Sequence, residues 1–173
     1  MSDAVVELHR AAHDGDVAKL SAILNADPQI VHAMPKGSYS ALIGAVIAGQ
    51  EPAARYLLLK GSDPNRHAPA WVCSSLLPLV MYAHKYHDPV PLATAILDAG
   101  ADIDIQDDKG TTPLHIAAYK GNLALAKLFI MSGASTSLKD KKQRTPMDVA
   151  KEYNHPQIIE LLRDSRPLRS KLL

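Results

Sequence analysis

The chain has 173 residues, 47% of them hydrophobic, which is enough for one domain with a substantial core and excludes a disordered chain. Nineteen basic residues against 18 acidic ones leave a net charge of +1, without the basic stripe typical of a nucleic-acid-binding protein. Its single cysteine excludes an intrachain disulfide, and the first ten residues lack the pattern of a signal peptide. No apolar run reaches the roughly 18 residues that cross a bilayer. We therefore expect a cytoplasmic protein with no membrane segment and no nucleic-acid partner.

The first part of the chain predicts three copies of a helix–turn–helix unit. The first copy reads Leu8-His9-Arg10-Ala11-Ala12, then Gly15, then Leu20 to Leu24, and in the second Gly61 follows Leu42 after 19 residues. The third copy is irregular, because Gly100 follows Leu77 after 23 residues rather than 19, with the extra residues in a histidine-rich stretch. We expect these units at about residues 2–35, 36–68 and 69–106.

The fourth and fifth copies are the clearest. The fourth opens with Thr112-Pro113, and the fifth with Thr145-Pro146, 33 residues later. A threonine can cap a helix N-terminus, and a proline fits the first turn, where a missing N–H costs nothing. Gly121, and Asn154 in the equivalent place, predict a left-handed residue that ends the first helix. We expect these units at about 107–139 and 140–165, followed by a basic tail at 166–173.

The fourth unit, Thr112-Pro113-Leu114-His115-Ile116-Ala117-Ala118 followed by Gly121-Asn122 and Gly133-Ala134, resembles the ankyrin-repeat family, for which a 33-residue period is expected. The resemblance implies an all-α repeat solenoid of about five helix–turn–helix units joined by β-hairpin fingers, in one ankyrin-repeat domain over 1–165. One helix pair cannot bury its own apolar face, so stacked neighbours supply the core. Terminal units with polar outer faces favour a monomer.

The resemblance also implies that a partner protein binds in the concave groove of first helices and at the finger tips. Five of the eight aromatic residues fall on groove positions, a bias that core packing alone does not explain. Tyr and Trp are also enriched at interface hot spots. We expect the partner to contact Tyr39, Trp71, Tyr82, Tyr86, Lys109, Thr111, Tyr119, Lys120, Lys142, Arg144 and Tyr153.

Structural interpretations compete with this one. Tyr82 and Tyr119 would then lie flat against the next repeat as packing, and Trp71 would fill the irregular third finger. The basic cluster at 139–144 would be a solvated turn. The two interpretations of Tyr119 differ in outcome, because truncating a packing residue lowers the melting temperature, whereas truncating a contact residue weakens binding.

Catalytic chemistry has no support in the sequence. It contains no glycine-rich phosphate loop, nucleophile elbow or paired-carboxylate motif. His84, His87 and Asp88 have a spacing that could reach one metal ion from a single helical turn, but no second His or Cys pair accompanies them. The resemblance gives His115 a structural role that bridges finger and helix. We expect a non-enzymatic adaptor, inhibitor or regulatory subunit with no cofactor or metal; the alternative is a metal or small-molecule sensor built on the third repeat.

Overall fold

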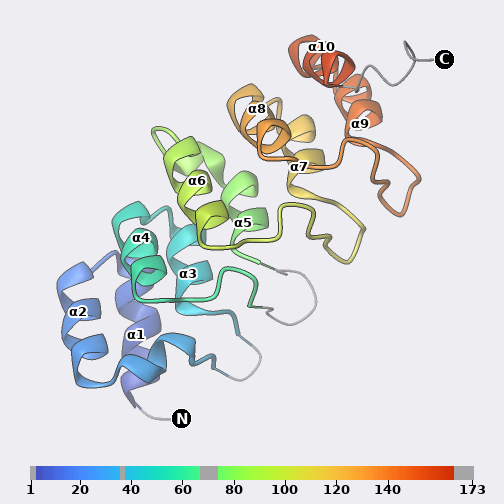
Figure 1. Cartoon of the computed structure of the whole chain (residues 1–173). Coiled ribbons are helices and arrows are strands. Elements are labelled where there is room, and N and C mark those ends of the chain that lie inside the picture. Colours follow the sequence, from blue (N-terminus) through green and yellow to red (C-terminus); the bar gives the residue numbers. More distant parts are fainter. Residues whose placement is uncertain (1–2, 36–37, 67–73, 166–173) are drawn as a thin grey trace. The chain divides into compact units, whose positions relative to one another are not determined.

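The computed structural model describes residues 3–35, 38–66 and 74–165. The chain divides into two compact units, with the boundary between Asp102 and Ile103 (Figure 1). A single domain was expected over residues 1–165. The described residues form ten α-helices, two short 3₁₀-helices and no β-strand.

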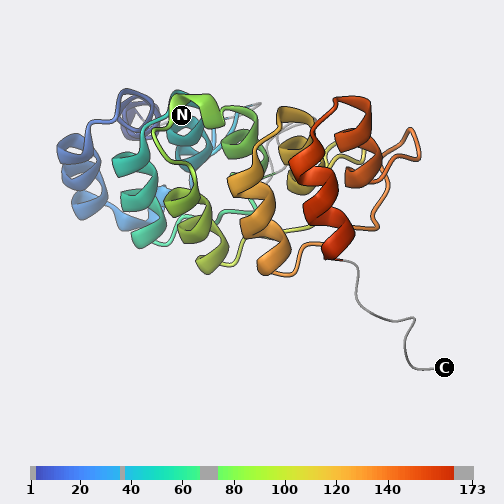
Figure 2. The same ribbon diagram turned by 90° about the horizontal axis from the view of Figure 1, so that it is seen from above.

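The first unit contains three helix pairs, in which first helices stack on first helices and second helices on second helices (Figure 2). The 3₁₀-helices follow the second helix of the first pair and the first helix of the third pair. The elements are α1 (Asp3–Asp14), α2 (Val17–Ala26), η1 (Pro28–His32), α3 (Ala41–Ala48), α4 (Glu51–Leu59), α5 (Leu76–Met81), η2 (Ala83–Lys85) and α6 (Val90–Asp98).

The second unit contains two further pairs, stacked in the same way: the first helix of one pair packs on the first helix of the other, and the second on the second. The pairs are α7 (Pro113–Lys120) with α8 (Leu123–Met131), and α9 (Pro146–Glu152) with α10 (Pro156–Asp164).

The core of each unit consists mainly of alanine and aliphatic side chains. Helix α3 buries every residue from Ala41 to Val46. In the second unit, Ala117 and Ala118 are fully buried on α7, which packs against α9. These small side chains let neighbouring first helices approach closely. Phe129, on α8, is the largest fully buried side chain among the residues that the structure describes.

The helix starts of the second unit confirm the predicted threonine caps. The Thr112 hydroxyl accepts the His115 N–H at 3.3 Å, and the Thr145 hydroxyl accepts the Asp148 N–H at 3.3 Å. In both cases the side chain three residues on bonds back to the N–H of the threonine, which completes a capping box. Two otherwise unpaired N–H groups are thus satisfied at each helix end.

The predicted left-handed residues are also confirmed. Gly121 ends α7 with φ +70°, and Asn154 holds the equivalent position after α9 with φ +55°. A Cβ on Gly121 would lie 2.6 Å from Cε1 of His155, whereas a Cβ on Gly133, at φ +92°, would have nothing within 4 Å. Gly121 therefore serves both the backbone turn and the close approach of the next repeat.

We expect Gly121→Ala to lower the free energy of unfolding by about 2 kcal/mol, because left-handed strain of about 1 kcal/mol is joined by a clash. Gly133→Ala is the matched control, since it incurs the strain alone. Urea denaturation of both proteins measures the difference. Adding His155→Ala should recover part of the loss, and equal effects at the two glycines would contradict the packing argument.

The β-hairpin fingers expected from the resemblance are not confirmed as strands. The loops before α7 and α9 are tight turns, in which the Asp107 N–H donates to the Thr111 carbonyl and the Asp140 N–H to the Arg144 carbonyl. One backbone hydrogen bond joins the two loops, from the Lys141 N–H to the Lys109 carbonyl at 2.8 Å, and the Gln106 side chain donates to the Lys139 carbonyl at 3.4 Å. Each turn closes around an aspartate side chain, so the backbone does not extend into a ladder.

The extra residues of the third repeat cover the C-terminal end of α3. The Lys85 ammonium donates to the Ile47 carbonyl at 2.6 Å, and the Tyr86 hydroxyl donates to the Val46 carbonyl at 2.6 Å. Carbonyls in the last turn of a helix lack partners within the helix and carry partial negative charge. The insertion therefore acts as a cap supplied by the neighbouring repeat.

Candidate functional site

Two exposed tyrosines in the second unit make direct contact. Tyr119, near the end of α7, and Tyr153, just after α9, meet edge to face with ring centroids 4.5 Å apart. They keep 41% and 44% of their surface exposed, although large aromatic side chains are usually more buried. The Lys120 ammonium lies over the Tyr119 ring, 5.3 Å from its centroid, and His155 Nε2 is 3.1 Å from the Tyr119 carbonyl. The pair is thus fixed by both helices.

An ion-pair network ties the fifth-repeat turn to the end of α9. Arg144 donates to both Asp140 and Glu152, at 2.7 Å and 2.6 Å. Asp140 is buried, and its Oδ1 also accepts the N–H groups of Lys142 and Arg144 at 2.9 Å. Burial alone would raise the pKa of Asp140, but these hydrogen bonds and the Arg144 charge outweigh it and lower the pKa below its ordinary value. The Arg144 guanidinium is therefore occupied by contacts within the chain, where it links the fifth-repeat turn to α9.

Four lysines of the second unit, Lys109, Lys120, Lys141 and Lys142, have no carboxylate partner among the described residues. They are all exposed. Thr111, predicted as a contact, is half-buried in the turn, and its N–H donates to Asp107. With the tyrosine pair, the lysines form what we term the basic aromatic surface: Lys109, Tyr119, Lys120, Lys141, Lys142 and Tyr153.

The predicted contacts in the first unit do not form a comparable cluster. Tyr39 and Tyr82 are half-buried; the Tyr39 ring lies against Gly44, and the Lys85 ammonium lies 5.0 Å from the Tyr82 ring centroid. Trp71 lies outside the described residues.

Tyr86 corrects the prediction of a partner contact. Only 9% of its surface is exposed, and its hydroxyl is bonded to α3. Burial, with a smaller contribution from the charge of Glu51, raises the pKa of Tyr86 well above its ordinary value. The sequence placed Tyr86 in an exposed insertion, but that insertion folds back as a cap.

A sequence profile of ankyrin repeats (three copies) matches residues 80–169, more than half of the chain. The chain belongs to the ankyrin-repeat family. It is similar to human Rabankyrin-5, with 28% identity over 132 residues that cover 67% of this chain and 11% of that protein. The chain therefore spans about a tenth of the length of this relative. Ankyrin repeats are generally protein–protein interaction modules and are generally non-enzymatic.

His115 has the structural role that the ankyrin resemblance implied. Its ring bridges Thr112, 2.8 Å from the hydroxyl, and the Arg144 carbonyl, 3.0 Å away. Burial lowers the pKa of His115 and outweighs the opposing hydrogen bond to Arg144, so the neutral form is favoured. In the first unit, His9 makes the corresponding bond to the Tyr39 carbonyl at 3.0 Å.

The metal-sensor alternative gains no support from the ankyrin fold. In the described part of the chain, no group of three or more His, Cys, Asp or Glu side chains is arranged to hold a metal ion. Asp88, one of the three candidate ligands, accepts the Val90 N–H at 3.0 Å at the start of α6.

None of the helices among the described residues is long and apolar enough to cross a membrane.

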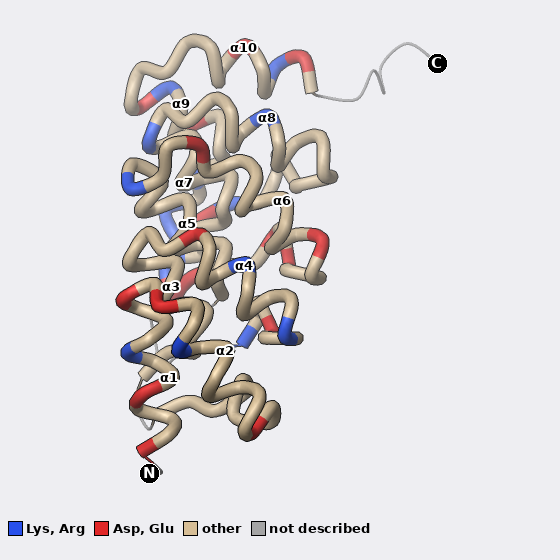
Figure 3. The backbone as a smooth tube through the Cα atoms, turned by 90° about the vertical axis from the view of Figure 1, so that its left-hand side faces the viewer, with Lys and Arg blue, Asp and Glu red and all other residues tan. Residues whose placement is uncertain are grey.

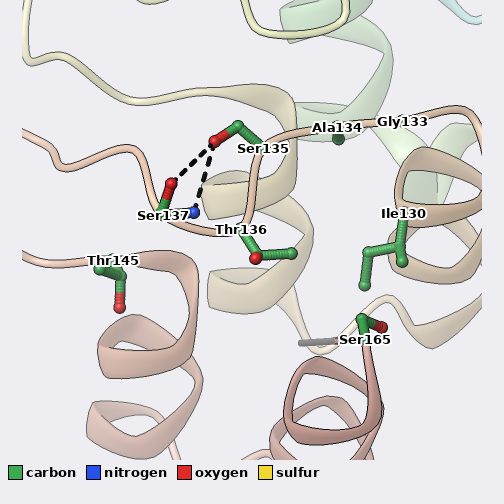
Figure 4. Close-up of a pocket in the computed structure, with 8 residues that line it drawn as sticks. All are labelled: Ile130, Gly133, Ala134, Ser135, Thr136, Ser137, Thr145 and Ser165. Carbon is green, nitrogen blue, oxygen red and sulfur yellow. Dashed lines mark hydrogen bonds between the residues drawn. The ribbon is translucent and has the colours of Figure 1, made fainter. Parts of the chain in front are cut away.

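The sequence did not indicate a pocket of about 600 Å³ beside α8 (Figure 4). The Ser135 and Ser137 hydroxyls lie 3.2 Å apart on one side of it. Its lining carries no acidic or basic side chain that could activate a hydroxyl as a nucleophile. The lining residues are Ile130, Gly133, Ala134, Ser135, Thr136, Ser137, Thr145 and Ser165.

Proposed function

We propose that this ankyrin-repeat chain is a non-enzymatic adaptor, inhibitor or regulatory subunit that binds a partner protein through the basic aromatic surface. The observation that carries the proposal is the edge-to-face contact of Tyr119 with Tyr153, two residues that each keep more than 40% of their surface exposed. Tyrosines held rigidly at a surface lose little side-chain entropy on binding and are frequent hot spots. Cytoplasmic location and a monomeric state stay predictions.

The ordered framework beneath these rings supports rigid docking. The ring of His155 lies against Gly121, and the Arg144 network joins the adjacent turn to the end of α9. Preorganisation of this kind lowers the cost of ordering side chains on association. Of the sequence-predicted contacts, Lys109, Thr111 and Lys142 lie in the turns before α7 and α9, and Lys120 is the last residue of α7.

The test is affinity capture from lysate of the source cells, with quantitative mass spectrometry, comparing the wild type with Tyr119→Ala/Tyr153→Ala. A specific partner should be depleted at least about tenfold by the double substitution, since hot-spot tyrosines contribute on the order of 2 kcal/mol. Tyr56→Ala is the matched control, because Tyr56 on α4 also carries a lysine, Lys60, 5.4 Å from its ring centroid.

Thermal denaturation of the same proteins separates binding from packing. Losing the ring contact should cost about 1 kcal/mol, equivalent to a fall of roughly 2–4 °C in melting temperature. A much larger fall would assign the pair to packing. A partner retained equally by the wild type and the double variant would refute binding at this surface.

A further inference from the structure

Resting on the proposed function, we infer that the segment bound at the basic aromatic surface is an acidic peptide segment with an aromatic or aliphatic anchor. The anchor contacts Tyr119 and Tyr153, and its flanking carboxylates meet Lys109, Lys120, Lys141 and Lys142. The inference depends on how the charges of the second unit are already paired.

The carboxylates nearest the tyrosine pair are engaged within the chain. Glu152 precedes Tyr153 but pairs with Arg144 at 2.6 Å, and Asp140 is buried beneath the same guanidinium. In the neighbouring turn, Asp107 Oδ1 accepts the N–H groups of Lys109 and Thr111, both at 2.8 Å. These three acids are therefore held by other groups and do not pair with the lysine side chains.

The lysine side chains keep their charge uncompensated. In the first unit, Lys19 pairs with Glu7 at 3.5 Å and Arg55 with Glu51 at 2.8 Å, whereas the exposed Lys60 forms no ion pair with a described residue. Asp108 is an exposed acid beside Lys109, but the four lysines of the surface outnumber it. An acidic segment would thus meet net positive charge around an apolar centre, which favours its approach and its orientation.

The distribution of charge favours a peptide over a polyanion. Lys and Arg are interspersed with Asp and Glu over the described residues, and the basic cluster at 139–144 is short (Figure 3). The net charge of the whole chain is only +1. A nucleic acid or an anionic membrane contacts a larger area than a short segment does, and the exposed surface of the second unit also carries acids such as Asp148 and Glu160.

The experiment is a selection of random short peptides displayed on phage, using the full chain as bait and Tyr119→Ala/Tyr153→Ala for counter-selection. Enriched peptides should carry Asp or Glu on both sides of an aromatic or aliphatic residue. In fluorescence anisotropy, Lys120→Glu/Lys142→Glu should weaken binding of the most enriched peptide at least about tenfold, because the substitutions turn charge attraction into repulsion. Lys127→Glu, which reverses an exposed charge on α8 of the same unit, should change the affinity for this peptide by less than about twofold.

The remaining outcomes separate this inference from the proposed function. Peptides that require the tyrosine pair but are neutral or basic would overturn the acidic specificity and leave the binding surface standing. Peptides that bind the counter-selected protein equally, or no enrichment at all, would overturn both. An oligonucleotide that binds the wild type and the tyrosine variant equally, and displaces the peptide, would show that the surface binds polyanions in general rather than an acidic peptide segment.

Discussion

Phe129→Ala is expected to lower the free energy of unfolding of the second unit by about 3–5 kcal/mol, the usual cost of truncating a buried phenylalanine. Phe129 is fully buried on α8, which packs against both α7 and α10. Its removal leaves a cavity between these helices, which are held by their caps and turns and so fill it only in part. Urea denaturation followed by circular dichroism measures the loss.

Met131→Ala is the matched control for Phe129→Ala. Met131 lies two residues further along the same helix and is 86% exposed, so its truncation should change the free energy of unfolding by less than about 0.5 kcal/mol. Hydrogen exchange identifies the affected helices, because in stacked repeats the loss should be greatest in the nearest neighbours. Similar effects at the two positions would contradict the assignment of the core.

Asp140→Ala is expected to lower the free energy of unfolding by about 3 kcal/mol, because it leaves Arg144 without its buried partner. The Asp140 carboxylate accepts the N–H groups of Lys142 and Arg144 and two bonds from the guanidinium, at 2.7 and 2.9 Å. Without it, the fifth-repeat turn loses its internal acceptor, and Arg144 keeps only its bond to Glu152 at 2.6 Å. Asp140→Asn keeps a side-chain oxygen but no charge, and it should lower the free energy of unfolding by less than Asp140→Ala does.

The stability that the Asp140 charge contributes should depend on pH in a defined direction. Because the folded-state pKa of Asp140 is lowered, this contribution is present above the unfolded-state value of about 3.9. It is lost as the pH falls through the folded-state pKa.

The measurement is the difference in free energy of unfolding between the wild type and Asp140→Asn, from neutral pH to acid. The gap should narrow below about pH 4. Asp148, whose pKa is also lowered, mainly by hydrogen bonds from Thr145, is present in both proteins and cancels in the comparison. A gap that stays constant into acid would show that the Asp140 charge does not stabilise the turn.

Much of the fold was predictable because its signals are local. The capping boxes at Thr112 and Thr145 depend on a side chain and an N–H three residues apart, and the left-handed Gly121 and Asn154 depend on their own backbone preferences. A recurring period of 33 residues then implies that one unit is stacked on copies of itself. The absence of β-strands among the described residues could not be predicted this way, since the fingers close on aspartate side chains.

The candidate site was predictable only in outline. By itself, the sequence determined the repeat, its helix ends, lysines at the equivalent positions 109 and 142, and a tyrosine late in the first helix of both the fourth and the fifth unit. Only the tertiary structure decided that Tyr119 meets Tyr153, that Arg144 is held by its own chain, and that Tyr86 is buried against α3. Helix ends are decided within four residues, whereas the contacts of Tyr119 and Tyr86 join residues a repeat or more apart and depend on packing between repeats. The partners of Arg144 are close in sequence, but only the folded turn brings both carboxylates to one guanidinium.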